Sequence, residues 1–178
     1  MTVFISGGAK CGKSSIAQDL AVKLSEGGRL FYVATMIPSG AEDRERIRHH
    51  LLDRAGMGFE TIECFRDIGA IADPTGTFLV DNITSLMQNA LFPAEKSYEM
   101  DLESADRCAE MLVQFAHQVR SAVFVSDYIY SDAERYSGTT ECYRRCLADA
   151  DRRLAKLCDV VIEVSAGIPI IHKGAINL

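Results

Sequence analysis

The sequence lacks the features that mark membrane and secreted proteins. In its 178 residues, no apolar run approaches the roughly 18 residues that a helix needs to cross a bilayer. The apolar start, 1–5, ends at Ser6 without a basic leader or a small-residue cleavage site, so it is typical of a first strand. We therefore expect a cytoplasmic protein with no membrane span, folded as one domain over residues 1–178.

Metal-binding cysteine motifs and a basic surface are also lacking. The six cysteines include no Cys-x-x-Cys pair, and Cys142 and Cys146, four residues apart on a predicted helix, have no further ligands nearby. Free buried thiols are favoured over a zinc site. The net charge of −6 argues against binding nucleic-acid phosphates over a broad surface, so we expect no nucleic-acid partner. Any anionic ligand must be held by a focused local site.

Segments with the character of strands and helices alternate along the chain. Apolar or β-rich runs predict strands at 2–6, 30–34, 59–64, 77–81, 122–126, 160–164 and 168–173, and helical spacing predicts helices from 13 to about 26, at about 39–54, and at 67–72, 82–91, 102–121 and 140–157. The last two strands, joined by a tight turn, predict an antiparallel hairpin. The pattern predicts a three-layer α/β fold with a mostly parallel sheet, whose ligands gather at the carboxyl ends of the strands.

A glycine-rich segment between the first strand and the first helix has the form of a Walker A phosphate loop, or P-loop. Residues 7–14 read Gly-Gly-Ala-Lys-Cys-Gly-Lys-Ser, which matches G-x-x-x-x-G-K-S. Its backbone N–H groups would cradle phosphates, Lys13 would contact the β and γ phosphates, and the Ser14 hydroxyl suits Mg²⁺. The alternative is a glycine-rich turn that binds no ligand. The strand-to-helix context favours a nucleoside triphosphate site.

An acidic residue closes a later buried strand. Asp81 follows Phe-Leu-Val at 78–80, which has the form of a Walker B strand. Its carboxylate would hold the water shell of Mg²⁺ beside Ser14. The alternative is that Asp81 caps the following helix.

The charged helix expected at 39–54 carries two adjacent histidines. His49 has Glu45 four residues before it and Asp53 four residues after it, so all three would share one face. Either carboxylate could orient the imidazole, which when neutral is a competent nucleophile toward an α-phosphate. Spacing alone, however, favours an ordinary surface histidine.

Five blocks of sequence occur in an order that resembles one enzyme family. They are Gly-Gly-Ala-Lys-Cys-Gly-Lys-Ser at 7–14, Tyr-Val-Ala-Thr at 32–35, Arg-Ile-Arg-His-His at 46–50, Thr-Ile-Glu at 61–63 and Leu-Val-Asp-Asn-Ile-Thr at 79–84. Together they resemble the bifunctional adenosylcobinamide kinase/adenosylcobinamide-phosphate guanylyltransferases of cobalamin biosynthesis. The resemblance covers nearly the whole chain, and its most specific block is the one at 46–50.

The resemblance implies a RecA-like P-loop fold, a homotrimer and two reactions. Adenosylcobinamide is phosphorylated by ATP or GTP with Mg²⁺, and GMP is then transferred from GTP to the phosphate through a covalent adduct on His49. It implies Lys13 and His49 as catalytic residues, Ser14 and Asp81 as metal ligands, and a nucleotide site made of Gly7, Gly8, Ala9, Lys10, Cys11, Gly12, Lys13, Ser14, Ser15, Ala34, Thr35, Met36, His50, Leu51, Leu52, Asp53, Glu63 and Asp81.

Beside a mild change at Arg54-Ala55, where the family has Arg-Pro, one segment departs strongly from that family. Where the family has Asn-Glu-Val-Gly and a glycine-rich stretch, this chain has Asp-Tyr-Ile-Tyr-Ser-Asp at 127–132. Tyr128, Tyr130 and Tyr136 could stack on a ligand, although packing is the commoner use of such side chains. Two alternatives follow: a P-loop kinase for another small alcohol, with His49 a bystander, and a GTP-binding regulatory protein whose acceptor site at 127–137 is lost.

Overall fold

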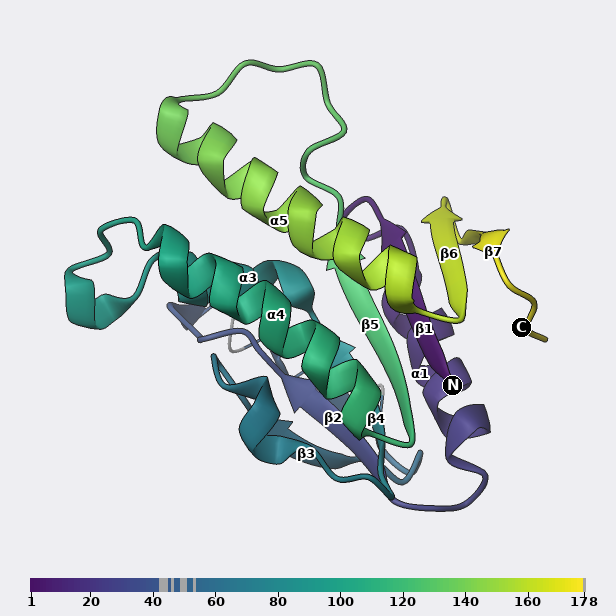
Figure 1. Cartoon of the computed structure of the whole chain (residues 1–178). Helices are drawn as coiled ribbons and strands as arrows, with labels where there is room; N and C mark the ends of the chain where they lie inside the picture. The colour runs from purple at the N-terminus through teal and green to yellow at the C-terminus, as the bar shows by residue number, and fades with distance from the viewer. Residues whose placement is uncertain (42–44, 46, 49–50, 53, 178) are drawn as a thin grey trace.

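A mostly parallel sheet forms the centre of the protein. The computed structural model describes residues 1–41, 45, 47–48, 51–52 and 54–177. Within them the sheet has seven strands in the order β3-β2-β4-β5-β1-β6-β7, and only β7 runs antiparallel, beside β6 (Figure 1). The expected sheet and C-terminal hairpin are thus confirmed. The strands are β1 (Thr2–Gly7), β2 (Leu30–Ala34), β3 (Glu60–Glu63), β4 (Thr77–Asp81), β5 (Ser121–Asp127), β6 (Val160–Ser165) and β7 (Ile168–Lys173).

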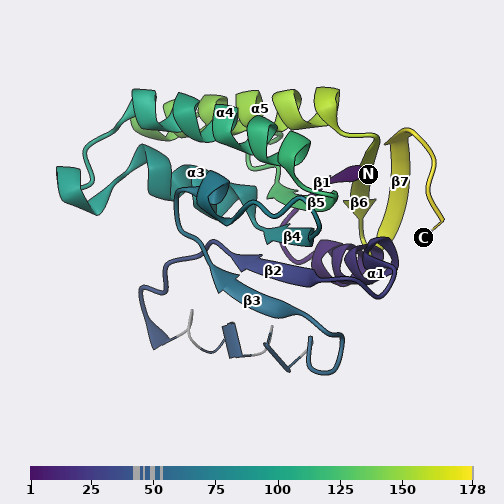
Figure 2. The same ribbon diagram turned by 60° about the horizontal axis from the view of Figure 1, so that its bottom comes forward.

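Helices cover both faces of the sheet, which gives the expected three layers. Figure 2 shows α3, α4 and α5 along one face and α1 on the other. The helices are α1 (Lys13–Ser25), α3 (Ile83–Leu91), α4 (Leu102–Gln118) and α5 (Gly138–Leu157), with short 3-10 turns η1 (Ile68–Ile71) and η2 (Ala94–Lys96). Among the described residues, none of the helices combines the length and apolar character needed to cross a bilayer.

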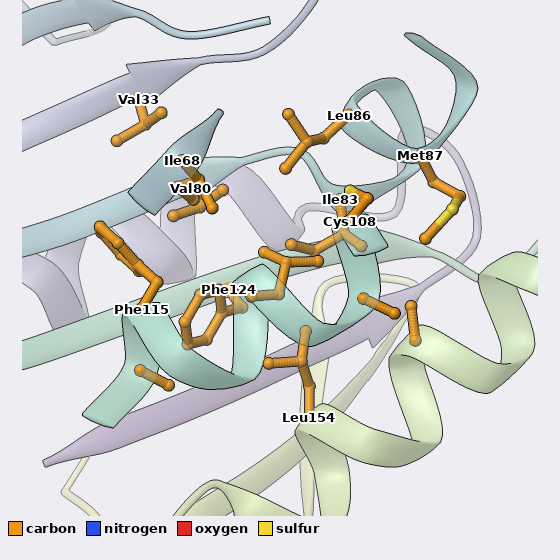
Figure 3. Close-up of a cluster of buried hydrophobic side chains, with 14 of the residues drawn as sticks. Val33, Ile68, Val80, Ile83, Leu86, Met87, Cys108, Phe115, Phe124 and Leu154 are labelled. Carbon is orange, nitrogen blue, oxygen red and sulfur yellow. The ribbon is translucent and has the colours of Figure 1, made fainter. Parts of the chain in front are cut away.

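Two apolar cores hold the layers together. The central strands are apolar at successive positions because parallel strands covered by helices bury side chains on both faces. Figure 3 shows the larger core, in which Phe115 of α4 packs over Phe124 of β5 and near Val80 of β4. The Phe115 ring meets the Phe78 and Phe124 rings edge-on, at 5.1 and 6.3 Å between centroids. The smaller core lies under α1, around Leu20.

Helix boundaries differ from the sequence prediction by a few residues, for local reasons. Helix α3 begins at Ile83 because the Asn82 side chain accepts a hydrogen bond from the backbone N–H of Ser85, at 2.8 Å, as an N-cap. Helix α4 ends at Gln118, and Ser121 is already the first residue of β5, paired with Thr77. Of the charged helix expected at 39–54, residues 41, 45, 47–48 and 51–52 are helical and Arg54 lies in a turn, whereas 42–44, 46, 49–50 and 53 lie outside the described residues.

Removing the Phe115 ring tests the larger core. Phe115→Ala should lower the free energy of unfolding by about 3–5 kcal/mol, because the fully buried ring leaves a cavity between α4 and the sheet. Leu102→Ala, at a position on the same helix that is 54% exposed, should change it by less than about 0.5 kcal/mol. Urea unfolding measures both, and equal losses would contradict this account of the core.

Candidate nucleotide and phosphate-transfer site

The P-loop turns sharply between β1 and α1, at the carboxyl edge of the sheet (Figure 1). Gly12, the N-cap of α1, has a φ of 97°, which side chains with a β-carbon rarely adopt. A β-carbon on Gly7 would lie 2.6 Å from the carbonyl oxygen of Val164, so close approach of β6 also demands glycine. Gly7 and Gly12 therefore serve the backbone path of the loop, which is what a phosphate cradle requires.

Lys13 is buried and already bound to an anion of its own chain. Its side chain lies under the loop, and the residue is only 5% exposed. The ammonium donates hydrogen bonds to the carbonyl oxygen of Gly8, at 2.6 Å, and to Oδ1 of Asp127, at 2.7 Å. The second oxygen of Asp127 accepts from Nδ2 of Asn82, at 2.9 Å. An incoming phosphate would therefore compete with Asp127 for this lysine.

Asp127 was not among the residues predicted from the sequence. Its signal is the same as that of Asp81, because each is the last residue of a buried strand. The two strands are neighbours, so both carboxylates lie at the same edge of the sheet. The partnership with Lys13 could not be read from the sequence, since 114 positions separate the two residues.

Asp81 and Ser14 supply oxygen atoms of the kind that Mg²⁺ prefers. Ser14 is the second residue of α1, and Oδ2 of Asp81 accepts a hydrogen bond from the Tyr32 hydroxyl at 2.9 Å. In the part of the chain that the structure describes, no three His, Cys, Asp or Glu side chains gather as a metal cage. These few hard oxygen donors fit an ion that keeps most of its waters and shares the substrate's phosphates.

A pocket of about 140 Å³ opens at the carboxyl ends of β2, β3 and β4. It brings together six residues of the predicted nucleotide site, namely Ala34, Thr35, Met36, Leu51, Glu63 and Asp81. Leu52 is 59% exposed and does not line it. His49, His50 and Asp53 lie outside the described residues.

A buried arginine forms one wall of the pocket, and sequence reasoning missed it. The Arg54 guanidinium lies 3.4 Å from the centre of the Tyr32 ring, and Nη2 donates to the Thr61 hydroxyl at 3.3 Å. The residue is 6% exposed. A stacked cation and ring give this wall a flat, positively charged surface. Such a surface suits a planar or anionic group of a ligand.

The base of the pocket is fixed by Thr35 and Asn82. The Thr35 hydroxyl donates to the Asn82 carbonyl oxygen and accepts from the Asn82 N–H, both at 2.8 Å. Asn89 of α3 donates to the Thr35 carbonyl oxygen at 2.8 Å. These contacts tie the end of β2 to the start of α3. In this structure Thr35 therefore supports the pocket as well as lining it.

The segment that follows β5 is bound to its own chain through its tyrosines. The Tyr130 hydroxyl donates to Oδ2 of Asp151 at 2.8 Å, and the Tyr136 hydroxyl donates to Asp132 at 2.9 Å. Burial, followed by the influence of Glu163, raises the pKa of Tyr128. Two of the three tyrosine hydroxyls thus hold this segment against α5 and within itself.

Asp151 is the most deeply buried of the carboxylates that the structure describes. It is 2% exposed, and Oδ2 also accepts from the Ser126 hydroxyl at 2.8 Å, whereas Oδ1 has no hydrogen-bond partner. Burial raises the pKa of Asp151 to about 7, against the pull of its two hydroxyl donors. The carboxyl group thus takes up a proton in the folded protein at a pH where an exposed aspartate is ionised.

A strand, a P-loop with a buried lysine and a helix on a parallel sheet define a P-loop nucleotide-binding fold. Solved structures agree at the level of the fold. A protein of Pyrococcus horikoshii OT3 aligns with a TM-score of 0.52 and 9% identity, over 99% of this chain and 87% of that one. An ATPase of a type III secretion system of pathogenic bacteria aligns with a TM-score of 0.54 and 13% identity, over 91% and 50%.

The family follows from a match that spans most of the sequence. The model of the cobinamide kinase / cobinamide phosphate guanyltransferase family matches residues 3–171, so the chain belongs to that family. Its members are kinases and guanylyltransferases of cobalamin biosynthesis. Among curated proteins, none matches the chain significantly.

Replacing Asp151 tests the buried carboxyl group. The unfolded chain loses this proton near pH 4 and the folded chain only near pH 7, so the folded state binds more protons between them. Stability contributed by the wild-type side chain therefore falls as pH rises from about 4 to about 7 and is constant above. Asp151→Asn should thus gain stability relative to wild type over that window, by roughly 2–4 kcal/mol at pH 8.

Urea unfolding at several pH values between 4.5 and 8 measures this difference. The control is Asp149→Asn, on the same helix, whose side chain is 39% exposed. It should show no such pH dependence. A difference between wild type and Asp151→Asn that is equally large at pH 4.5 and pH 8 would contradict the assignment.

Proposed function

We propose that the chain, as one P-loop transferase domain over 1–178, phosphorylates adenosylcobinamide and then transfers GMP from GTP to the adenosylcobinamide phosphate. The observation that carries this proposal is the P-loop with buried Lys13 at the same sheet edge as the pocket in which six family-matched residues meet. The nucleotide donor of each reaction bears the phosphates that react, and both reactions require these phosphates to be held without bulk water. The supply of ATP and GTP makes the cytoplasm the expected place of action.

In the kinase half, the P-loop binds the nucleotide and aligns its terminal phosphate. Lys13 would leave Asp127 and turn to the β and γ phosphates, since charge-assisted bonds to phosphate oxygens compensate the lost ion pair. Ser14 and Asp81 would hold Mg²⁺, which offsets negative charge on the phosphates when bound. The N-terminus of α1 adds its partial positive charge.

In the transfer half, His49 is the proposed nucleophile. Its imidazole nitrogen would attack the α-phosphate of GTP, so that an N–P bond forms and the bond to the β-phosphate's bridging oxygen breaks, releasing pyrophosphate. The phosphate of adenosylcobinamide phosphate would then attack the same phosphorus and free the histidine. The family-matched position of His49 in the 46–50 block supports this role, and the cationic wall of Arg54 and Tyr32 suits the planar guanine.

A covalent adduct tests the transfer half. Wild type mixed with GTP and Mg²⁺ should gain the mass of one GMP, lost on mild acid treatment because a phosphoramidate is acid-labile. His49→Ala should gain nothing, and intact-protein mass spectrometry reads both results. Lys13→Ala should also gain nothing, because the phosphates lose their cationic partner.

The matched control is His172→Ala. The His172 side chain is 52% exposed and bonds Glu163 at 2.9 Å on β6, so its loss should leave the adduct intact. No adduct on wild type that still binds GTP would remove the histidine intermediate from the proposal. An adduct that survives in His49→Ala would assign it to another residue.

We also propose that the active form is a homo-oligomer, a trimer by family resemblance. Three isoleucines of the edge strand β7, Ile168, Ile170 and Ile171, are 65, 46 and 38% exposed, which favours a covered edge. Light scattering after gel filtration should give three times the 19.6 kDa of the chain. A monomer mass at micromolar concentration would reject the trimer.

A further inference from the structure

The carboxylate of Asp127 occupies the centre of the phosphate-handling edge. It ends β5, the strand between β1, which leads into the P-loop, and β4, which ends at Asp81. In the sheet register it is the direct partner of Gly7, the first glycine of the loop. One carboxylate oxygen lies 2.7 Å from the Lys13 ammonium, and its side chain is 21% exposed. A group bound at Lys13 therefore lies within reach of this carboxylate.

The position of Asp127 does not depend on Lys13 alone. Its Oδ2 accepts from Nδ2 of Asn82, and its backbone N–H donates to the hydroxyl of Thr84, each at 2.9 Å. Asn82 is held in turn as the N-cap of α3. The carboxylate thus stays aimed at the phosphate site after the lysine has turned to a nucleotide.

Nucleotide binding changes the charged groups around the Asp127 carboxylate. Once Lys13 contacts the β and γ phosphates, Asp127 loses its cation and faces further negative charge. A carboxylate beside phosphates is stabilised by a group that can give it a proton or a hydrogen bond. The hydroxyl that attacks the γ-phosphate is such a group, and it must lose its proton as the new bond forms.

Other described carboxylates around the loop have different partners. Asp81 binds the Tyr32 hydroxyl, Glu163 binds His172, and Asp151 is enclosed at 2% exposure. In the described part of the chain, Asp127 is the carboxylate that is both partly exposed and bonded to the P-loop lysine.

We propose that Asp127 is the general base of the kinase half, held by Lys13 until the nucleotide takes the lysine away. This assignment rests on the proposed function. The acceptor's hydroxyl oxygen bonds to the γ-phosphorus, and the bond from that phosphorus to the β–γ bridging oxygen breaks. Its electron pair leaves with the nucleoside diphosphate. The hydroxyl proton passes to the Asp127 carboxylate and then to water, so Asp127 starts the next cycle ionised.

The guanylyl-transfer half gives an internal comparison. Its acceptor is already a phosphate anion, so no hydroxyl proton has to be removed. Loss of the base should therefore affect the kinase half and spare the other half. A ligand of Mg²⁺ or a purely structural residue would affect both.

The experiment compares wild type, Asp127→Asn and Asp127→Glu. Phosphorylation of adenosylcobinamide is measured with ATP or GTP, guanylylation is measured with preformed adenosylcobinamide phosphate, and nucleotide affinity is measured by calorimetry. For Asp127→Asn, the kinase kcat should fall about 10²- to 10⁴-fold, the usual contribution of a general base. Guanylylation should stay within about 3-fold, and nucleotide should bind as tightly as in wild type or more tightly, because Lys13 is released.

Two further variants serve as controls. Asp127→Glu keeps a carboxylate and should recover part of the kinase rate, even where Asp127→Asn folds less well. Asp19→Asn changes an exposed aspartate on α1 and should leave all three measurements unchanged.

The outcomes separate the role of Asp127 from the function itself. A kinase rate within 10-fold of wild type for Asp127→Asn, or equal loss of both halves with weaker nucleotide binding, would overturn the assignment. If wild type itself acts on no cobinamide substrate, the proposed function fails and the proposed acceptor with it. The nucleotide affinities still test whether Lys13 exchanges Asp127 for the phosphates. Tighter binding by Asp127→Asn supports that exchange, and weaker binding rejects it.

Discussion

The parallel pairing of β5 with β1 on one side and β4 on the other is the constraint on which the site depends. Parallel strands end at the same edge, so the P-loop, Asp81 and Asp127 are brought together by the sheet register alone. The ion pair between Lys13 and Asp127 joins the start of α1 to the end of β5 at that edge. Because the lysine is buried, its charge needs a partner at all times, whether a carboxylate or a phosphate.

The two cores maintain this strand register with different kinds of side chain. The larger one, between the sheet and α3, α4 and α5, is built around interlocking phenylalanines, whereas α1 rests on smaller aliphatic side chains. Since α1 begins at Lys13, its packing on the sheet also sets the entry of the phosphate loop. The segment after β5 is fastened to α5 by the Tyr130 hydroxyl, which donates to Asp151, and Ser126 of β5 donates to the same carboxyl group. Burial favours the neutral form of this carboxyl group, because an enclosed charge is costly.

Several residues of the candidate pocket could be named from the sequence, and the misses have two separate causes. The P-loop could be read directly, and family matching gathered Ala34, Thr35, Met36 and Glu63, which the structure places around one pocket. Arg54 was missed because its role in the pocket depends on stacking on Tyr32, a contact that no rule of sequence spacing predicts. Helix limits were displaced where a side-chain cap such as Asn82 overrode the apolar periodicity.

The sequence by itself determined the alternation of strands and helices, the phosphate loop and the family, because each depends on residues that are contiguous or in fixed order. Tertiary structure alone decided which carboxylate faces Lys13, since positions 13 and 127 meet only through strand pairing. It also decided that Asp151 is buried with a raised pKa, because burial is a property of the packed layers. Motifs made of neighbouring residues can be recognised in the sequence, whereas the electrostatic partners of a buried charge are set by the fold.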